Sequence, residues 1–301
     1  MSNVIEVQGL TKRFGSLVAV DDVSFSVRRG EIFGLLGKNG AGKTTTVEIL
    51  EGYQSPDAGT VKVLGVEPKD GGRLWKDRIG LVLQDSDFDP GHTVAETVNL
   101  FAGFFSRPKS VSETLALVGL TDKANVRIGR LSGGQRRRVD VALGIIGSPE
   151  LLFLDEPTTG FDPSARREFW TMLEGLRSTG TSILLTTHYM EEAQHLCDRI
   201  AILATGRIVA EGTASTLIAL SGSTSLRFAH DVALDIDAMS SATNLSFRVV
   251  GDTLSADLSN SQGDLLRLLH YCEAKGIVLD GLEVVRPTLD DVFLDVTGEP
   301  S

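Results

Sequence analysis

The string G-K-N-G-A-G-K-T-T at residues 37–45 constrains this chain more than any other feature. It fits the phosphate-loop pattern G-x-x-x-x-G-K-[ST], follows a short apolar run, and leads into residues 44–50, which are typical of a helix start. Gly37, Gly40 and Gly42 let the backbone adopt conformations closed to residues with a Cβ, so that successive N–H groups can face an anion. A strand, a glycine-rich loop and a helix N-terminus in this order predict a phosphate site, whereas the string alone would fit an ordinary turn.

Two side chains of this loop have the right chemistry for a bound nucleotide. Lys43 would reach the β- and γ-phosphates as a cation, and Thr44 would offer its hydroxyl to a Mg²⁺ ion. The dipole of the helix that follows adds to the attraction for phosphate.

Composition and charge exclude several classes of protein. A length of 301 residues predicts one large domain and a smaller one, and a net charge of −11 argues against a nucleic-acid backbone or an anionic membrane surface as a nonspecific partner. The two cysteines, Cys197 and Cys272, show no metal-site spacing and are expected in the core of a protein from a reducing compartment. Neither a signal-like N-terminus nor an apolar run of about 18 to 20 residues is present, so we expect a cytoplasmic protein whose membrane part belongs to another chain.

The residues before the loop predict an antiparallel edge sheet. Residues 4–7 and 23–27 alternate apolar and polar side chains, with turn-prone residues 12–16 between them. Phe14 falls in that predicted turn, where an exposed ring could stack on a purine base. A core position is the alternative for Phe14.

Polar side chains end several apolar strands further along the chain. Gln84 follows the run at 78–83, Asp155 and Glu156 follow the run at 151–154, and His188 follows the run at 182–187. Ligands of open α/β sheets bind at the carboxyl ends of the strands, so we expect these side chains to converge beside the phosphate loop. Taken singly, each would be an ordinary surface group.

The region between the first and second of these runs predicts a helical insert. Thr93 starts a capping-box pattern, and Ser132 is well placed to cap a further helix that begins with Gly133 and Gly134. The adjacent glycines leave backbone N–H groups open to a second anion, whereas the simpler interpretation is a capped helix with a solvated arginine face. Phe104 is predicted to point outward and to contact a partner, with a core position as the alternative.

These motifs, taken together, resemble those of one family. In order, they are similar to the A-loop, Walker A, Q-loop, signature, Walker B, D-loop and H-loop of ABC transporter ATPase subunits: Phe14, residues 37–45, Gln84, L-S-G-G-Q at 131–135, D-E-P-T at 155–158, G-F-D at 160–162 and His188. The resemblance covers about the first 220 residues. One departure is Phe161, which stands where the family usually has Leu and leaves Asp162 in place.

The resemblance implies both activity and site. The chain is expected to be an ATPase with ATP and Mg²⁺ as cofactors, and the residues expected to bind the nucleotide are Phe14, Gly37, Asn39, Gly40, Ala41, Gly42, Lys43, Thr44, Thr45, Ser132, Gly133, Gly134, Gln135 and Asp162. By the same resemblance, Thr44, Gln84 and Asp155 would hold Mg²⁺. The residues with catalytic roles would be Glu156, which polarises the attacking water, and His188, Gln84 and Lys43.

The implied assembly is a head-to-tail dimer with a second ATPase subunit, in which residues 132–135 of one subunit cover ATP on the other. It would drive a polytopic permease of the ABC-2 type at the cytoplasmic face of the membrane, exporting drugs, lipids or similar hydrophobic compounds, with no nucleic-acid partner. A soluble ABC ATPase acting on ribosomes or DNA is the second interpretation, but such proteins usually carry two cassettes or long coiled coils. A noncatalytic binding module is the third, and it would have little need for Glu156.

The expected fold is α/β. Residues 1–222 would form a P-loop ABC ATPase domain with a mostly parallel core sheet, an antiparallel edge sheet and a helical insert at about 85–145, and residues 223–301 a small α+β domain. In the tail the pattern predicts a strand at 224–229, a hairpin at 245–257, a helix starting near Leu265 and a last helix capped by Thr288. The closing residues resemble the C-terminal domain of drug-resistance ABC-2 ATPases, which implies packing, dimerisation or regulation.

Overall fold

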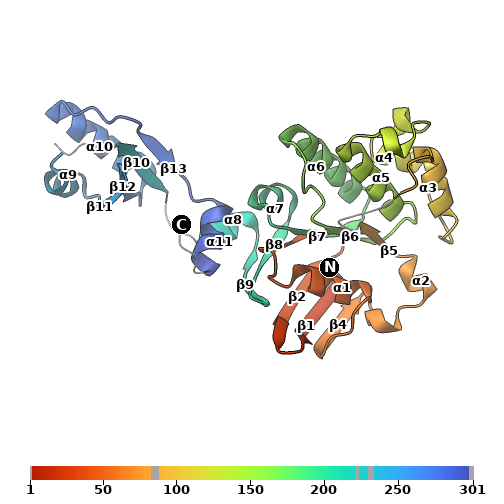
Figure 1. The fold of residues 1–301 in the computed structure, drawn as a ribbon. Coiled ribbons are helices and arrows are strands. Elements are labelled where there is room, and N and C mark those ends of the chain that lie inside the picture. Colours follow the sequence, from red (N-terminus) through yellow and green to blue (C-terminus); the bar gives the residue numbers. More distant parts are fainter. Residues whose placement is uncertain (1, 83–87, 221–223, 230–233, 298–301) are drawn as a thin grey trace. The chain divides into compact units, whose positions relative to one another are not determined.

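The chain forms two compact units, Met1–Ala214 and Ser215–Ser301 (Figure 1). The computed structural model describes residues 2–82, 88–220, 224–229 and 234–297. The first unit ends at Ala214, whereas the sequence placed the boundary after residue 222, because the short helix α8 (Ala214–Ile218) falls almost wholly in the second unit.

A six-stranded sheet forms the centre of the first unit, in the order β5-β6-β7-β3-β8-β9. Its strands pair in parallel except for the antiparallel pair β8–β9, which confirms the predicted mostly parallel core sheet. The bounds are β3 Ile32–Leu36, β5 Ile79–Val82, β6 Leu151–Asp155, β7 Ser182–Thr187, β8 Arg199–Ala204 and β9 Arg207–Gly212. The inner strands are continuous apolar runs because both faces of the sheet are covered.

The predicted antiparallel edge sheet is also present, in the order β2-β1-β4. Its strands are longer than the sequence pattern indicated: β1 Asn3–Phe14, β2 Leu17–Arg28 and β4 Ala58–Val63. Phe14 pairs with Leu17 at the end of this ladder, so the turn is confined to residues 15–16, within the range 12–16 predicted for it. Shifts of register between β1 and β2 carry the pairing past the point where the apolar alternation stops.

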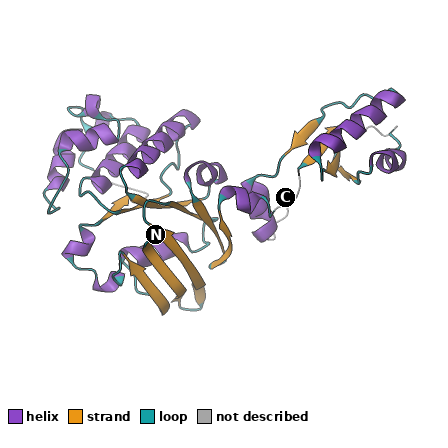
Figure 2. Cartoon of the chain, turned by 180° about the vertical axis from the view of Figure 1, so that it is seen from behind, coloured by secondary structure: helices purple, strands orange, loops and turns teal. Residues whose placement is uncertain are grey.

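Two cores lie on the two faces of the central sheet (Figure 2). Alternate residues of a strand point to opposite faces, so Leu152 and Leu154 of β6 join the core under the helices, whereas Leu151 and Phe153 join the core shared with the edge sheet. Helix α1 lies on the edge-sheet side, and the helices of the insert lie on the other. The helices of this unit are α1 Lys43–Glu51, α2 Arg73–Lys76, α3 Val94–Ala102, α4 Val111–Leu117, α5 Gly133–Ile145, α6 Pro163–Ser178 and α7 Met190–Leu196, with short 3-10 turns η1 Pro68–Asp70, η2 Thr121–Lys123 and η3 Ile128–Arg130.

The helical insert follows its predicted caps. Thr93 and Glu96 form a reciprocal capping box at the start of α3, and Ser132 forms another with Gln135 at the start of α5. Phe104 is 63% exposed, as predicted, whereas Phe105 lies beyond the end of α3 and packs its ring against Gly147.

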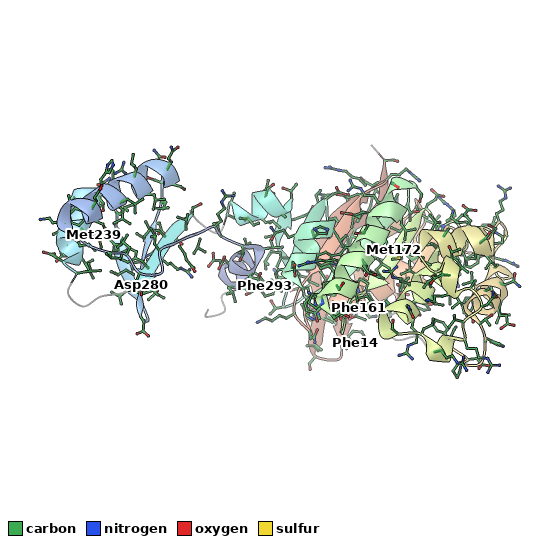
Figure 3. All side chains as sticks on the ribbon, turned by 90° about the horizontal axis from the view of Figure 1, so that it is seen from above. Phe14, Phe161, Met172, Met239, Asp280 and Phe293 are labelled. Atoms are coloured by element: carbon green, nitrogen blue, oxygen red, sulfur yellow. The ribbon has the colours of Figure 1, made fainter. Side chains whose placement is uncertain are left out.

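The second unit is a β-α-β-β-α-β sandwich of the ferredoxin-like kind, with strand order β11-β12-β10-β13 and antiparallel neighbours. Its bounds are β10 Ser225–Ala229, α9 Ile236–Thr243, β11 Phe247–Val250, β12 Thr253–Asp257, α10 Ser261–Lys275, β13 Glu283–Val285 and α11 Leu289–Thr297. The sequence missed α9, which carries only two buried residues, Met239 (labelled in Figure 3) and Thr243. Among the described residues, none of the helices has the length and apolar character needed to span a membrane.

Candidate functional site

The predicted site residues follow three neighbouring strands of the central sheet. The phosphate loop follows β3, His188 follows β7, and Asp155 ends β6. Leu36 pairs with Thr187 and Asp155 with Thr186, so the carboxyl ends of the three strands are level with one another. Gln84, predicted from the end of β5, lies outside the described residues.

The loop curls around the side chain of Lys43, which is only 5% exposed. The Lys43 ammonium donates to the carbonyl oxygens of Gly37 at 2.7 Å and Lys38 at 3.2 Å. Gly42 has a φ of +102°, and a Cβ there would lie 2.4 Å from the carbonyl oxygen of Ala19. Only glycine fits that position, which explains why the loop closes as the pattern requires.

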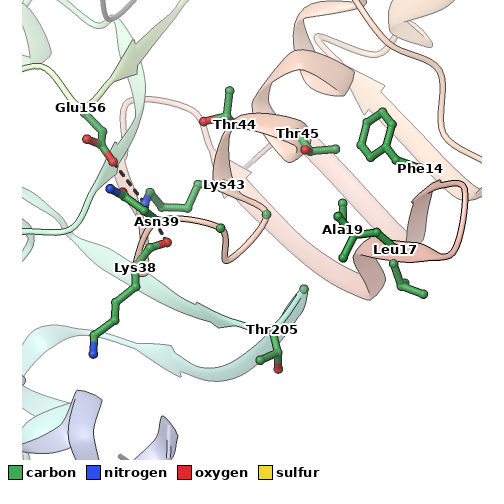
Figure 4. Close-up of a pocket in the computed structure, with 14 residues that line it drawn as sticks. Phe14, Leu17, Ala19, Lys38, Asn39, Lys43, Thr44, Thr45, Glu156 and Thr205 are labelled. Atoms are coloured by element: carbon green, nitrogen blue, oxygen red, sulfur yellow. Dashed lines mark hydrogen bonds and ion pairs between the residues drawn. The ribbon is translucent and has the colours of Figure 1, made fainter.

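A cavity of about 610 Å³ opens over this loop (Figure 4). Phe14, 46% exposed, lies at the far end from Lys43, so the alternative of a core position for this ring is excluded. The predicted residues that line the cavity are Phe14, Asn39, Gly40, Gly42, Lys43, Thr44, Thr45 and Glu156. Two predicted loop residues do not line it: the carbonyl oxygen of Gly37 accepts a hydrogen bond from Lys43, and Ala41 is buried. The cavity thus has cationic and N–H groups at one end and an aromatic ring at the other.

Glu156 is held between two basic side chains. One carboxylate oxygen lies 3.2 Å from Lys43 Nζ, and the other lies 3.2 Å from His188 Nδ1 in a contact that is not aligned as a hydrogen bond. Burial by itself raises the Glu156 pKa, but the hydrogen bond and charge of Lys43, with His188, outweigh burial and hold that pKa below its usual range. Glu156 is therefore a carboxylate at neutral pH.

The backbone of Glu156 is also constrained. Its φ of +42° lies in the left-handed region, which a residue with a Cβ occupies only at a cost of about 1 to 2 kcal/mol. The Glu156 N–H donates to the carbonyl oxygen of Thr186 at 3.2 Å and to its hydroxyl at 3.0 Å. The same hydroxyl donates to Asp155 Oδ1 at 2.5 Å. Thr186 therefore holds the Asp155 carboxylate and the backbone of Glu156 at the end of β6.

The signature residues line a second cavity, of about 490 Å³, and not the one over the phosphate loop. Ser132, Gly133 and Gly134 lie on one side of it, and Asp162 lies on another, where its carboxylate caps α6 by accepting from two backbone N–H groups at 2.9 Å. A Cβ on Gly133 would meet no atom within 4 Å, so nothing within this chain demands glycine there. Glu156 lines both cavities.

Two buried charged residues near the site were missed by sequence reasoning. The alternative of a solvated arginine face does not hold for Arg137, which is 7% exposed and donates to the carbonyl oxygens of Asp155 at 2.9 Å and Pro157 at 3.0 Å. Glu192 is fully buried, and its carboxylate accepts from the Thr158 hydroxyl at 2.8 Å and the Trp170 indole at 3.2 Å. Burial raises the Glu192 pKa. The sequence position of Glu192 could have indicated its burial, because Glu192 lies with Ala193 and Leu196 on the buried stripe of α7.

The residues present fit a magnesium ion that is held largely by phosphate and water. Among the described residues, no cluster of three or more histidine, cysteine or acidic side chains could hold a metal by itself. Mg²⁺ commonly uses one or two carboxylates together with substrate phosphates. Here Thr44 lines the cavity, and the Asp155 carboxylate accepts from the Thr186 hydroxyl at the end of β6, two strands from β3. The metal set predicted from the sequence contains one acid, Asp155, which agrees with an ion that takes its other ligands mainly from phosphate and water.

Comparison with known proteins places these features in a family. A family model for ABC transporters matches residues 20–159. The chain is similar to the Nod factor export ATP-binding protein I of Ralstonia nicotianae, with 38% identity over 313 aligned positions that cover 98% of this chain and 94% of that protein. It is 45% identical to the protein of the same name from Bradyrhizobium diazoefficiens over 224 positions, 72% of this chain and 73% of the relative.

Solved structures of ABC transporter subunits also resemble this chain. An ATP-binding subunit of an ABC transporter matches 72% of this chain and 92% of its own, with a TM-score of 0.64 and 27% identity. The cbiO1 protein of Clostridium perfringens, part of the transporter complex cbiONQ, matches 73% of this chain and 92% of its own, with a TM-score of 0.68 and 26% identity. A dimeric ATP-binding cassette in a post-hydrolysis state with ADP and Pi matches 69% of this chain and 98% of its own, with a TM-score of 0.61 and 25% identity. This chain belongs to the family of ABC transporter ATP-binding subunits, and its enzymatic activity is the hydrolysis of ATP.

Proposed function

We propose that this chain is the ATP-hydrolysing motor of an exporter, acting as a head-to-tail dimer that drives a separate membrane permease from the cytoplasmic face of the membrane. The dimer is supported by the lining of the two cavities: Ser132, Gly133 and Gly134 line a different cavity from the one over the phosphate loop, so within one chain they do not cover that loop. A second subunit would bring Ser132, Gly133 and Gly134 over the loop. The unconstrained Cβ position of Gly133 is then explained by the close approach of a phosphate.

Binding of ATP would redistribute the charges of the site. The phosphates would attract the Lys43 ammonium, which pairs with Glu156 when no phosphate is near. Loss of that pairing would raise the pKa of Glu156 from its lowered value, making the carboxylate a better base for the attacking water. His188 lies on the opposite side of Glu156 and would contact the γ-phosphate, while the ring of Phe14 would stack on the purine.

A magnesium ion would be held by Thr44 and Asp155, together with Gln84, which lies outside the described residues. When bound, such an ion neutralises phosphate charge and holds the β- and γ-phosphates in position. The contribution of this chain is orientation: the Thr186 hydroxyl positions Asp155, and the loop N–H groups bind the phosphates.

The transport direction rests on the relatives, which are named for the export of Nod factor, and hydrophobic compounds remain the proposed class of cargo. The permease, of the ABC-2 type, would dock in a groove of about 420 Å³ on the first unit, here called the α2–α3 groove. It is mostly apolar, and its residues come from the end of α1 and the turn after it, α2, β5, α5, and the end of α3 with the segment after it: Glu51, Gly52, Tyr53, Arg73, Lys76, Asp77, Ile79, Gly80, Leu81, Phe101, Phe104, Phe105, Leu143 and Gly144. Apolar grooves of this kind bind amphipathic helices.

Mixing two inactive variants tests the dimer. Lys43→Ala damages the loop, and Ser132→Arg blocks the signature, so each homodimer should hydrolyse no ATP. A heterodimer contains one site with both parts intact, and it should recover about half of the activity of the wild-type dimer. Ser132→Ala, which removes the helix cap without adding bulk, serves as the control for local unfolding. If purified heterodimers are as inactive as their parents, the head-to-tail arrangement is wrong.

A further inference from the structure

Glu51 is a buried acid that the nucleotide site does not use. It is the last residue of α1, it is 8% exposed, and it lines the α2–α3 groove (α1 and α2 in Figure 1). Within the part of the chain that the structure describes, its carboxyl group has no hydrogen bond and no ion pair. An acid that is nine-tenths buried and unpaired is unusual, because a buried charge is normally compensated by a partner.

The surroundings of Glu51 disfavour its charged form. Burial, with the charges of Asp155 and Glu48, raises the pKa of Glu51 to about 8. All three influences oppose the charged form, and Glu51 lines the groove. A hydrogen-bond donor or a cation that enters the groove would meet an acceptor to which no side chain of the described residues donates.

The remainder of the groove indicates what kind of molecule would bring that cation. Its wall includes the exposed side chains of Tyr53 and Phe104, which are 66% and 63% exposed, and the partly buried Phe101. An occupant therefore needs apolar side chains for the wall and one long side chain that reaches the floor. Arginine and lysine have apolar stems and a charged end, so they fit a floor acid beneath an apolar wall.

We propose that the α2–α3 groove binds an amphipathic helix of the membrane partner that inserts one arginine or lysine side chain to pair with Glu51. This inference rests on the proposed docking of a permease and adds the chemistry that the docking helix must carry. Arg73, Lys76 and Asp77 also line the groove, but Arg73 and Lys76 are exposed to solvent, so screening weakens their effect on the occupant more than it weakens that of the buried acid. The buried acid, Glu51, therefore has the largest influence on which charge the groove prefers in its occupant.

Synthetic peptides test this inference without the permease. Three short amphipathic helical peptides share one apolar stripe and differ only at the central position, which is arginine, norleucine or glutamate. Their Kd values are measured with the full chain by fluorescence anisotropy at physiological salt. We expect the arginine peptide to bind the wild-type protein at least about tenfold more tightly than the norleucine peptide, and the glutamate peptide to bind more weakly than both.

Two variants locate the origin of the preference. Glu51→Gln keeps the size of the side chain and should abolish the preference for arginine, whereas Asp77→Asn, which removes an acid of the same groove, should retain it. A thermal melt of each variant establishes that it is folded. A preference that survives Glu51→Gln would arise from the general acidity of the chain and would overturn the inference.

The remaining outcomes separate this inference from the proposed function. If the three peptides bind equally well and Phe104→Asp weakens them all, the groove is a helix receptor, but Glu51 does not select a cation. If none of the peptides binds the wild-type protein, the groove does not receive amphipathic helices, and the docking proposal falls together with this one.

Discussion

At the scale of single residues, one ammonium group serves two anions. Lys43 holds the phosphate loop in shape through two carbonyl oxygens and pairs with Glu156 across the cavity. A bound phosphate would compete with Glu156 for the same ammonium, so occupancy of the site and the basicity of Glu156 are linked. Replacement of either residue should therefore affect a different step.

We predict that Lys43→Ala abolishes ATP binding, whereas Glu156→Gln binds ATP and hydrolyses it at least about a hundredfold more slowly. The alanine removes the charge that holds the phosphates. The glutamine preserves the shape of the side chain and removes the carboxylate that acts on water. Isothermal titration with ATP, followed by size-exclusion chromatography, distinguishes the two, because the Glu156→Gln protein should accumulate as an ATP-bound dimer. A Glu156→Gln protein that turns over ATP at the wild-type rate would refute the assignment of Glu156.

A second residue-scale prediction concerns the pH dependence of stability. The pKa of Glu51 is about 8 in the folded protein and near 4.5 in an unfolded chain, so between these values the folded state holds a proton that the unfolded state has released. The stabilisation linked to this proton is fully present below about pH 4.5 and is lost as the pH rises toward 8. Wild-type protein should thus lose about 2 kcal/mol more of its free energy of unfolding between pH 6 and pH 8 than Glu51→Gln.

Urea unfolding at the two pH values measures this difference. Glu273→Gln, which changes an exposed acid on α10, is the matched control and should follow the wild type. Equal pH dependence in the wild type and Glu51→Gln would mean that Glu51 is charged in the folded protein.

At the scale of elements, α5 connects the signature to the strand that carries the two carboxylates. Three arginines follow one another in its first turns, and only Arg137 is buried, where it binds the carbonyl oxygens of Asp155 and Pro157. Movement of α5 would therefore be transmitted to the backbone on both sides of Glu156. The neighbouring Arg136 is exposed and offers a natural control.

We predict that Arg137→Met lowers the free energy of unfolding by about 2 to 4 kcal/mol, because two buried carbonyl oxygens lose their donors. Arg136→Met should change it by less than about 0.5 kcal/mol. Chemical denaturation of both variants gives the comparison. Equal stabilities would show that the contacts of Arg137 are not needed to hold the strand end.

The two phenylalanines after α3 form another matched pair. Phe104 is 63% exposed at the groove, whereas Phe105 packs on Gly147. We predict that Phe104→Asp leaves the melting temperature within about 2 °C of the wild type but prevents co-purification with the permease, whereas Phe105→Asp lowers it by about 5 to 10 °C. A thermal melt beside a pull-down provides both readouts. A large drop for Phe104→Asp would assign that ring to the core.

At the scale of the whole molecule, the two units have separate cores. The core of the second unit is built from its own strands and from helices α9 and α10, with Phe228, Met239, Leu254 and Leu268 among its buried residues. The predicted role of this unit in dimerisation or regulation stays a prediction.

We predict that a fragment of residues 215–301 folds alone, with a single cooperative thermal transition, because a unit with its own core can in principle fold by itself. A protein ending at residue 214 should still bind ATP, because the loop and its cavity lie entirely within the first unit. Circular dichroism melts and ATP titration check the two pieces. An unfolded 215–301 fragment would show that this unit needs the first one.

The sequence by itself determined the features that depend on neighbouring residues. The phosphate loop, the capping boxes at Thr93 and Ser132, and the buried parallel strands were all predictable, because a glycine pattern, a cap and an apolar run act within a few residues of the chain. The order of the motifs was also enough to indicate the family.

Tertiary structure decided the features that depend on residues far apart in the chain. The burial of Arg137 and Glu51, the Lys43–Glu156 pair and the position of Phe14 within a strand arise from contacts between distant segments. Helix α9 has only a short apolar stripe, and its packing on α10 and the sheet, not its intrinsic propensity, makes it a helix. Local sequence pattern predicts where along the chain a functional side chain lies. The charge, burial and pairing of that side chain depend on the distant segments that pack against it.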